Sequence, residues 1–290
     1  MDKFYIITNS EKDKNLETTR RILEYLSAHG KTCTIREHQG KCPLLGKSPG
    51  RYTDDAWIPE GTECILVLGG DGTLIQAARD TVNRSIPLLG VNLGNLGYLA
   101  EIEKSGVIDA LDHLLLDDYT IEPRMMLEGT VHREKGESIR DIALNDIVVN
   151  RAGALRILDY EILVNGEPLN RYAADGVIVS TPTGSTGYSL SAGGPIISPK
   201  ASMIVVTPIC PHTLTARSIV LSGTDQVTLR LGSGRRTERE EAFVTFDGEV
   251  SVPIVTGDYV EIKKSRKTTN ILKISKISFL EILRTKMRGN

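Results

Sequence analysis

The sequence predicts a two-domain protein: an N-terminal doubly wound α/β domain, then a β-rich, sandwich-like C-terminal domain. Strand and helix patterns alternate over residues 1–118. From 119 to 275 they give way to short, mostly alternating strand patterns separated by turn residues. The chain has 290 residues, of which 40% are hydrophobic, so it can form two packed cores.

The N-terminal domain, residues 1–118, is predicted from apolar runs that alternate with helical patterns. Leu16, Ile22 and Leu26 recur at helical spacing, and Gly30 is a stop signal. The run "CILVLG" is typical of a parallel strand that is buried on both faces. We expect strands at 3–8, 31–37, 64–69 and 86–91, helices at 15–30, 73–80 and 106–118, and a surface loop at 38–60.

The C-terminal domain, residues 119–275, is predicted from short runs between turn signals such as Asn165-Gly166 and Asp247-Gly248. We expect strands at 125–133, 146–151, 158–167, 176–181, 203–209, 226–232, 242–249, 259–265 and 271–275. Residues 276–290 have apolar positions at helical spacing. They predict a C-terminal helix that returns to pack on the N-terminal domain.

Composition excludes several classes of function. The net charge of -2 gives no basic field for nucleic acid. No run approaches the roughly 18–20 apolar residues that a membrane helix requires, and the first residues do not resemble a secretion signal. The four cysteines stand apart, without a CxxC pair. We therefore expect reduced thiols and a cytoplasmic protein without nucleic-acid or membrane partners.

The stretch "LVLGGDGT", residues 66–73, places Asp71 among three glycines after a buried strand and before a helix. Such a turn lets backbone N–H groups approach a phosphate at the helix N-terminus. A carboxylate repels phosphate, so Asp71 needs another role. It is a candidate metal ligand or general base for a hydroxyl. Local pattern leaves a third role open, an Asx-turn or helix cap.

Three further stretches carry polar groups that suit a nucleotide. Residues 90–100 form a second glycine-rich loop after a strand. In "LND", Asn145 and Asp146 offer donors and acceptors for the two hydroxyls of a ribose, or simply start a strand. Residues 174–195 are rich in hydroxyls, and Tyr188 can stack on a base.

Other polar residues have weaker claims on a site. Arg156 and Arg171 are candidates to neutralise a diphosphate, although a lone arginine is usually a solvated surface residue. Asp247 is most simply a hairpin-turn residue. A serine hydrolase is disfavoured because "GSTG" is not a GxSxG elbow and histidine is sparse.

Taken in order, these segments resemble the NAD kinase family. "GGDGT" is shared with diacylglycerol kinases, but "LND", the long segment Ala174–Pro195 and "TPICPHTL" are similar to NAD kinase segments. The resemblance extends from about residue 60 to 260. It implies transfer of the γ-phosphate of ATP to the 2′-hydroxyl of the adenosine ribose of NAD, which produces NADP.

The resemblance also implies roles for individual residues. Asp71 would be the catalytic base, and Gly72 would share its contact. Asn145 and Asp146 would hold the adenosine ribose, and Asp175 would lie near the nicotinamide end. Arg156 falls where the family often has a ligand contact. The adenine and ribose pocket would be lined by Thr183, Thr186, Gly187, Tyr188, Ser189, Leu190 and Ser191.

Two positions depart from the family pattern. Ala173 stands where many members have an arginine, for which Arg171 is a candidate substitute, and Gly187 replaces an alanine. The resemblance further implies Mg²⁺ held mainly by nucleotide phosphates, and a homodimer or homotetramer. Polyphosphate stays open as a donor beside ATP. The alternatives are another GGDGT-type kinase, acting on a lipid or a sugar, and a non-catalytic nucleotide sensor.

Overall fold

The computed structural model describes residues 1–35, 53–94, 97–100, 102–153, 157–213, 215–232, 240–275 and 277–288. The chain divides into two compact units. Unit 1 comprises Met1–Pro123 and Thr269–Asn290, and unit 2 comprises Arg124–Thr268. Each unit is described here by itself. The part of the predicted surface loop from 38 to 52 lies outside the described residues.

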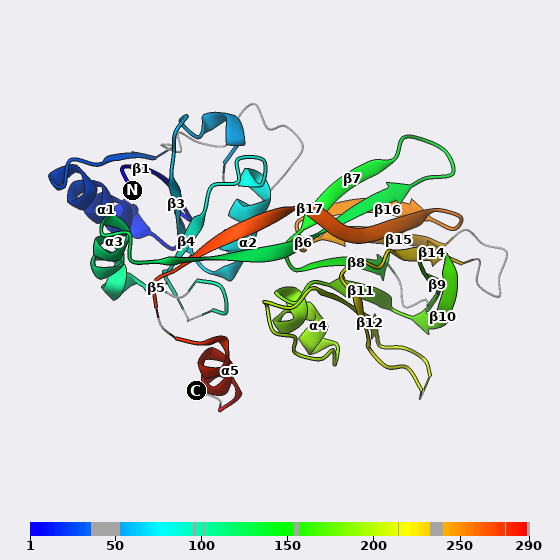
Figure 1. The fold of residues 1–290 in the computed structure, drawn as a ribbon. Coiled ribbons are helices and arrows are strands. Elements are labelled where there is room, and N and C mark those ends of the chain that lie inside the picture. The colour runs from blue at the N-terminus through cyan, green and yellow to red at the C-terminus, as the bar shows by residue number, and fades with distance from the viewer. Residues whose placement is uncertain are drawn as a thin grey trace. The chain divides into compact units, whose positions relative to one another are not determined.

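Unit 1 is built on a parallel sheet with the strand order β2-β1-β3-β4 (Figure 1). Its strands are β1 (Lys3–Thr8), β2 (Thr32–Ile35), β3 (Cys64–Gly69), β4 (Leu88–Asn92) and the short β5 (Ile102–Glu103). Its α-helices are α1 (Glu17–Ala28), α2 (Asp71–Thr81), α3 (Val107–Leu115) and α5 (Phe279–Met287). Short 3₁₀ turns precede α1 (η1, Lys14–Leu16), β3 (η2, Asp55–Trp57) and α3 (η3, Lys104–Gly106).

Helices α1 and α3 cover one face of this sheet, and α2 covers the other. Phe4, Leu66 and Leu89 share one core cluster with Ile22 of α1 and Leu111 of α3. Successive strand side chains point to opposite faces, so the intervening residues face the other side. There α2 packs closely: a Cβ built on Gly90 would lie 3.3 Å from a methyl of Leu74. This is the predicted doubly wound arrangement.

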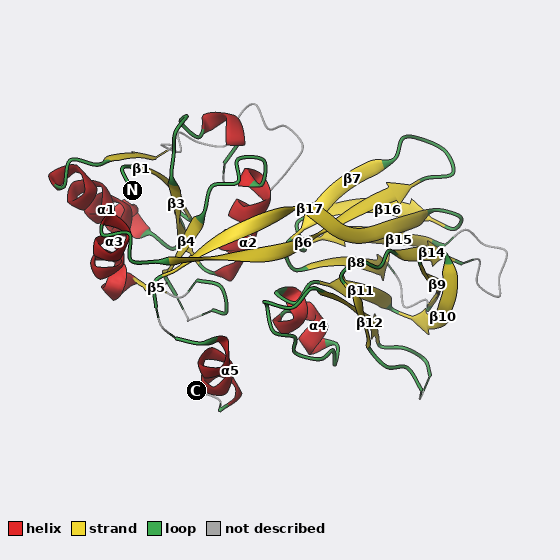
Figure 2. Ribbon diagram, in the orientation of Figure 1, coloured by secondary structure: helices red, strands yellow, loops and turns green. Residues whose placement is uncertain are grey.

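Unit 2 consists of two antiparallel sheets that enclose one core (Figure 2). One sheet has the order β13-β12-β11-β8-β15-β16, and the other contains β10-β9-β14-β17 together with β6 and β7. Core side chains come from both sheets, among them Tyr160 and Ile262 from one and Val149 and Val244 from the other. The predicted sandwich is therefore confirmed, and with it the fold class.

Every predicted run of unit 2 forms a strand, but four further strands, β7, β10, β13 and β16, were not predicted. The strands are β6 (Thr120–His132), β7 (Ile139–Ala143), β8 (Asp146–Arg151), β9 (Leu158–Val164), β10 (Glu167–Ala174), β11 (Gly176–Ser180), β12 (Met203–Ile209), β13 (Ile219–Ser222), β14 (Val227–Leu231), β15 (Glu241–Phe246), β16 (Val250–Val255) and β17 (Tyr259–Lys273). A short 3₁₀ turn, η4 (Gly184–Thr186), leads into the four-residue α4 (Tyr188–Ser191).

Several element boundaries also differ from the sequence prediction, and two of them have a clear physical reason. The strands expected at 259–265 and 271–275 form the single strand β17, which leaves unit 2 and enters unit 1. Polar residues between them interrupt the apolar alternation but not the backbone, because strand pairing uses main-chain groups. The helix expected at 106–118 ends at Leu115, and Asp117 then takes a φ of 55°, which a right-handed helix does not accommodate.

Candidate functional site

In unit 1, the glycine turn after β3 sets Asp71 at the first residue of α2. Gly70 is the N-cap of the helix. A Cβ on Gly69 would lie 2.2 Å from Thr73 Oγ1, so only glycine fits there. The turn thus stands at the carboxyl end of a parallel strand and at a helix N-terminus, where open α/β sheets bind their ligands.

The Asp71 carboxylate is fixed by the second glycine-rich loop. Oδ2 accepts the backbone N–H of Tyr98 at 2.7 Å, and Oδ1 accepts those of Leu99 at 3.2 Å and Ala100 at 3.1 Å. A Cβ on Gly97 would lie 2.0 Å from Oδ1. A carboxylate has about four lone-pair positions, so with respect to the described residues Oδ2 keeps one for a hydroxyl or a cation. These bonds do not correspond to an Asx-turn or a cap of α2, because the carboxylate accepts its hydrogen bonds from the loop at residues 98–100.

Gly72 and Lys12 lie at or near the glycine turn and differ in what surrounds them. Nothing lies within 4 Å of a Cβ built on Gly72, so its backbone is open to contact, and its predicted role stays a prediction. Lys12 was missed by the sequence reasoning. Its ammonium nitrogen lies 2.9 Å from the point that a Gly70 Cβ would occupy. The sequence signal that could have identified Lys12 is its position in the loop directly after β1, because β1 pairs with β3 in the sheet.

In unit 2, Asn145 precedes β8 and Asp146 is its first residue, and Asp247 fixes the backbone of both. The carboxylate of Asp247 accepts the N–H groups of Leu144 at 2.7 Å, Asn145 at 2.7 Å and Asp146 at 3.1 Å. Asp146 is 6% exposed. Burial and, second, the charge of Asp247 raise the pKa of the Asp146 carboxyl to about 7. Sequence reasoning treated Asp247 as a turn residue and missed these partners.

A hollow of about 280 Å³ gathers several of the predicted residues. Tyr188 is 48% exposed, which leaves its ring accessible. The amide oxygens of Asn145 and Asn150 are buried and have no hydrogen-bond partner within the described part of the chain. Buried polar atoms are normally paired, so these oxygens fit a ligand donor. The lining residues are Asn145, Asp146, Val148, Asn150, Tyr188, Thr245, Asp247 and Gly248.

The hydroxyl-rich segment is largely occupied with its own folding. The Ser189 hydroxyl is buried and lies 3.1 Å from Thr207 Oγ1. Thr186 Oγ1 donates to the carbonyl of Thr183, which is 7% exposed. Gly187 and Leu190 are half-buried, and Ser191 is exposed. The expected roles of these residues in binding stay predictions.

The remaining predicted residues lie in or next to β10. Asp175 forms an ion pair with Arg151, with 2.9 Å between Oδ1 and Nε. The Ala173 carbonyl accepts the N–H of His212 at 2.8 Å. Arg171 pairs with Glu161 at 3.3 Å on the surface, so it is already engaged. Arg156 lies outside the described residues. Arg151 is thus the cation that the structure sets beside Asp175.

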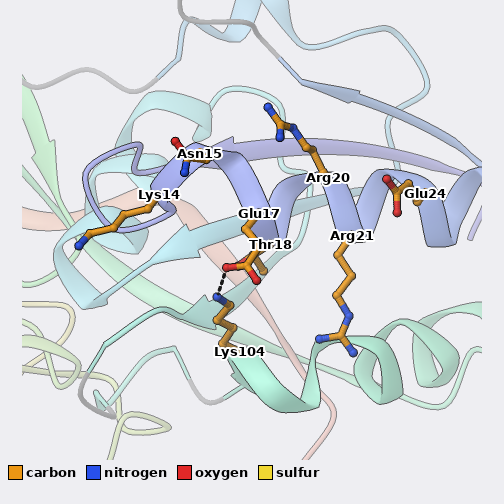
Figure 3. Close-up of a pocket in the computed structure, with 8 residues that line it drawn as sticks. All are labelled: Lys14, Asn15, Glu17, Thr18, Arg20, Arg21, Glu24 and Lys104. Carbon is orange, nitrogen blue, oxygen red and sulfur yellow. Dashed lines mark hydrogen bonds and ion pairs between the residues drawn. The ribbon is translucent and has the colours of Figure 1, made fainter.

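A second hollow, of about 510 Å³, lies in unit 1 beside α1 (Figure 3). Lys104 points toward Glu17, and their charged atoms are 2.7 Å apart. Exposed ion pairs of this kind contribute little free energy. The hollow contains no residue that the sequence singled out for chemistry. It is lined by Lys14, Asn15, Glu17, Thr18, Arg20, Arg21, Glu24 and Lys104.

Searches for two other kinds of site gave nothing among the described residues. No cluster of three or more histidine, cysteine, aspartate or glutamate side chains is arranged to hold a metal ion. No helix in the described ranges is long and apolar enough to cross a membrane.

Comparison with known proteins accounts for these features together. Residues 4–119 match the ATP-NAD kinase N-terminal domain and residues 144–274 match the ATP-NAD kinase C-terminal domain. The NAD kinase of Lachnospira eligens is 49% identical over 99% of this chain and 100% of its own length. That of Lachnoclostridium phytofermentans is 48% identical over 99% of each chain.

Solved structures show the same fold. Yeast NADH kinase complexed with NADH superposes with a TM-score of 0.87 at 23% identity, covering 100% of this chain and 88% of its own. An NAD kinase from Archaeoglobus fulgidus in complex with ATP gives 0.77 at 23% identity, over 99% of each chain. The two domain models and the full-length relatives agree, and the chain belongs to the NAD kinase family.

Proposed function

We propose that this chain is an NAD kinase that transfers the γ-phosphate of ATP to the 2′-hydroxyl of the adenosine ribose of NAD. Family membership over the whole chain supports the reaction. The observation that carries it is the fixed Asp71 carboxylate, which keeps one lone-pair position on Oδ2.

The proposed reaction is a direct, in-line transfer. The 2′-oxygen forms a bond to the γ-phosphorus while the bond from that phosphorus to the bridging β,γ-oxygen breaks. The hydroxyl proton passes to Asp71 Oδ2, and ADP leaves. The backbone of the glycine turn and the Lys12 ammonium are the groups of unit 1 that suit the donor phosphates.

The acceptor half of the proposal uses the hollow of unit 2. Asp146 and Asn145 offer acceptors and donors for ribose hydroxyls, and the exposed ring of Tyr188 offers a face for adenine. Its volume of about 280 Å³ suits a nucleoside rather than a whole dinucleotide. We therefore assign this hollow to the adenosine end of NAD, and we assign Asp175 and Arg151 to the nicotinamide end.

The donor set of the chain fits a magnesium ion that arrives with the nucleotide. Mg²⁺ is commonly held by one or two carboxylates together with substrate phosphates. Among the described residues no multi-residue cluster is present, and the remaining position on Asp71 Oδ2 is assigned to the attacking hydroxyl, so the ion would be held mainly by the nucleotide phosphates. When bound, the ion would neutralise charge on the phosphates. Metal dependence, a homodimeric or homotetrameric state and a cytoplasmic location belong to the proposal.

The test is an assay of purified protein with ATP, MgCl₂ and NAD, in which an NADP-specific dehydrogenase reports NADP. We expect NADP with ATP and NAD, and none after chelation of the metal. Exchanging ATP for polyphosphate, and NAD for NADH, defines the donor and acceptor range. If the protein bound NADP but formed no product with any pair of donor and acceptor, it would be a non-catalytic nucleotide sensor. Phosphorylation of a lipid or sugar without NADP formation would show a different GGDGT-type kinase.

A further inference from the structure

The turn between β15 and β16 has a backbone conformation that a simple hairpin explains. Asp247 has a φ of 51° and Gly248 a φ of 75°. The turn between β9 and β10 is its counterpart in the same unit, where Asn165 has a φ of 53° and Gly166 a φ of 85°. Aspartate and asparagine tolerate this left-handed region better than other non-glycine residues. The conformation alone therefore assigns no function to Asp247.

The carboxylate of Asp247, however, reaches beyond its own hairpin. It accepts three N–H groups from the segment 144–146, with Oδ2 on Leu144 and Oδ1 on Asn145 and Asp146. Its own N–H donates to the Asp146 carbonyl at 3.0 Å. Closing a hairpin needs none of these bonds. They join the turn to a segment about a hundred residues earlier in the chain.

The opposite side of the same segment is held by the strand end that follows β11. The Leu144 carbonyl accepts Thr181 Oγ1–H at 2.6 Å, and the Asn145 carbonyl accepts the Thr181 N–H at 2.8 Å. A Cβ on Gly184 would lie 2.2 Å from the backbone carbonyl oxygen of Asn145, so the two backbones are in close contact. The N–H groups of the segment are therefore held by the Asp247 carboxylate, and the carbonyls of Leu144 and Asn145 are held by Thr181.

We propose that Asp247 is a positioning residue for ribose recognition, holding the backbone of 144–146 so that Asn145 and Asp146 present their side chains to the sugar. The inference rests on the proposed function, because it concerns the same hollow. Side chains on a fixed backbone lose less freedom when they bind, and small misplacements near a reacting group are costly. Asp247 itself acts through the segment that it holds.

The test compares Asp247→Ala and Asp247→Asn with Asn165→Ala. The control is matched: Asn165 also joins its turn to another loop, through Asp225 at 2.9 Å and the Gln226 N–H at 3.0 Å, and it is not among the residues lining the hollow. We expect Asp247→Ala to raise the KM for NAD by roughly 10- to 100-fold. The KM for ATP should stay within about twofold, and kcat should change less than the KM for NAD. Asp247→Asn, which keeps one acceptor oxygen, should lie between wild type and Asp247→Ala.

Three results would overturn the inference. The first is an unchanged KM for NAD in Asp247→Ala. The second is an equal rise in both KM values, which a disturbance that is not confined to the ribose hollow would produce. The third is an effect of Asn165→Ala on the KM for NAD as large as that of Asp247→Ala. Absence of NADP formation by the wild type would instead refute the proposed function.

Hydrogen exchange of the wild type keeps the inference testable if the variants do not fold. The amides of Leu144, Asn145 and Asp146 should exchange slowly, as hydrogen-bonded groups of a stable unit do. Exchange as fast as at an exposed turn would show that the carboxylate does not hold them.

Discussion

Asp71 in unit 1 and Asp247 in unit 2 have the same immediate surroundings. Each comes after a strand and precedes a glycine, and each carboxylate accepts three consecutive backbone N–H groups. The loops that they hold differ. Asp71 fixes a glycine-rich loop and keeps a lone-pair position, whereas Asp247 fixes the segment that carries two proposed ligand groups. The same local chemistry thus serves a proposed reacting group in one unit and a positioning group in the other.

This comparison shows what a local motif leaves out. "GGDGT" stands out because its carboxylate lies among glycines after an apolar run, while "FDGE" is an ordinary hairpin pattern. In both cases the partners of the carboxylate lie elsewhere in the chain. The role of each aspartate is therefore set by the segment it meets, which local spacing does not encode.

The sharpest test of the comparison replaces each aspartate by asparagine. Asp71→Asn should lower kcat by about 10²- to 10⁴-fold, the usual contribution of a general base, with the KM for NAD within a few-fold. Asp247→Asn should act mainly on the KM for NAD. Steady-state kinetics with both substrates varied, and thermal melts as the control for folding, separate these patterns. If both variants lost kcat to the same extent, the division of roles would be wrong.

The second prediction concerns the charge that Asp247 places near Asp146. The folded-state pKa of Asp146, about 7, lies above the unfolded value of about 3.9. Protonated Asp146 therefore stabilises the fold fully below pH of about 4, and this contribution is lost as the pH rises through about 7. Because a pKa unit corresponds to about 1.4 kcal/mol, the effect is at most about 4 kcal/mol.

Asp146→Asn mimics the protonated form, so its melting temperature relative to wild type should rise between about pH 4 and pH 8, the interval that this titration covers. Repeating the comparison in Asp247→Asn should move the transition to lower pH, since one negative charge has been removed. A difference in melting temperature that does not change with pH would contradict the assignment of the raised pKa to Asp146.

The third prediction tests how closely the loop must approach Asp71. In Gly97→Ala the new Cβ would lie 2.0 Å from Asp71 Oδ1, so the loop or the carboxylate has to move. We expect kcat to fall by roughly 10- to 100-fold, as misplacement by about 1 Å does elsewhere. Gly106→Ala is the control, because nothing lies within 4 Å of its Cβ. Equal activity of the two variants would show that the carboxylate tolerates displacement.

The smallest effect is expected at Ser189. Its hydroxyl is buried against Thr207, so Ser189→Ala should lower the free energy of unfolding by about 0.5–1.5 kcal/mol. Chemical denaturation measures this loss. The KM for NAD should stay within about twofold, roughly 0.4 kcal/mol. A larger rise would favour the direct ligand contact that the family resemblance implies for this residue.

Much of the fold was predictable because periodicity reports burial. The run at Cys64–Gly69 is apolar throughout, and all six of its residues are buried in a parallel sheet. The boundaries of β17 were less predictable, because polar residues such as Lys267 and Asn270 stand where the backbone continues to pair. Hydropathy indicates which side chains are buried, but pairing depends on main-chain groups.

The candidate site was predictable only in part. Asp71, Asn145, Asp146 and Tyr188 are side chains whose chemistry can be read from the sequence, and the last three line one hollow. The contribution of Asp247 comes from a contact across about a hundred residues, and that of Gly97 from a close approach between two loops. Both depend on the folded arrangement, so a single sequence holds no local signal for them.

The division of the chain also bears on the order in which the protein folds during synthesis. Unit 2 is one continuous segment, Arg124–Thr268, whereas unit 1 also includes residues from Thr269 onward. Ile271 of β17 pairs with Leu88, the first residue of β4, and Leu272 belongs to the core of unit 1. Unit 1 is made first but cannot complete its sheet until these residues leave the ribosome. The later-made unit can therefore be the first to finish, and until then β4 lacks its partner at Leu88, although β5 pairs with its far end.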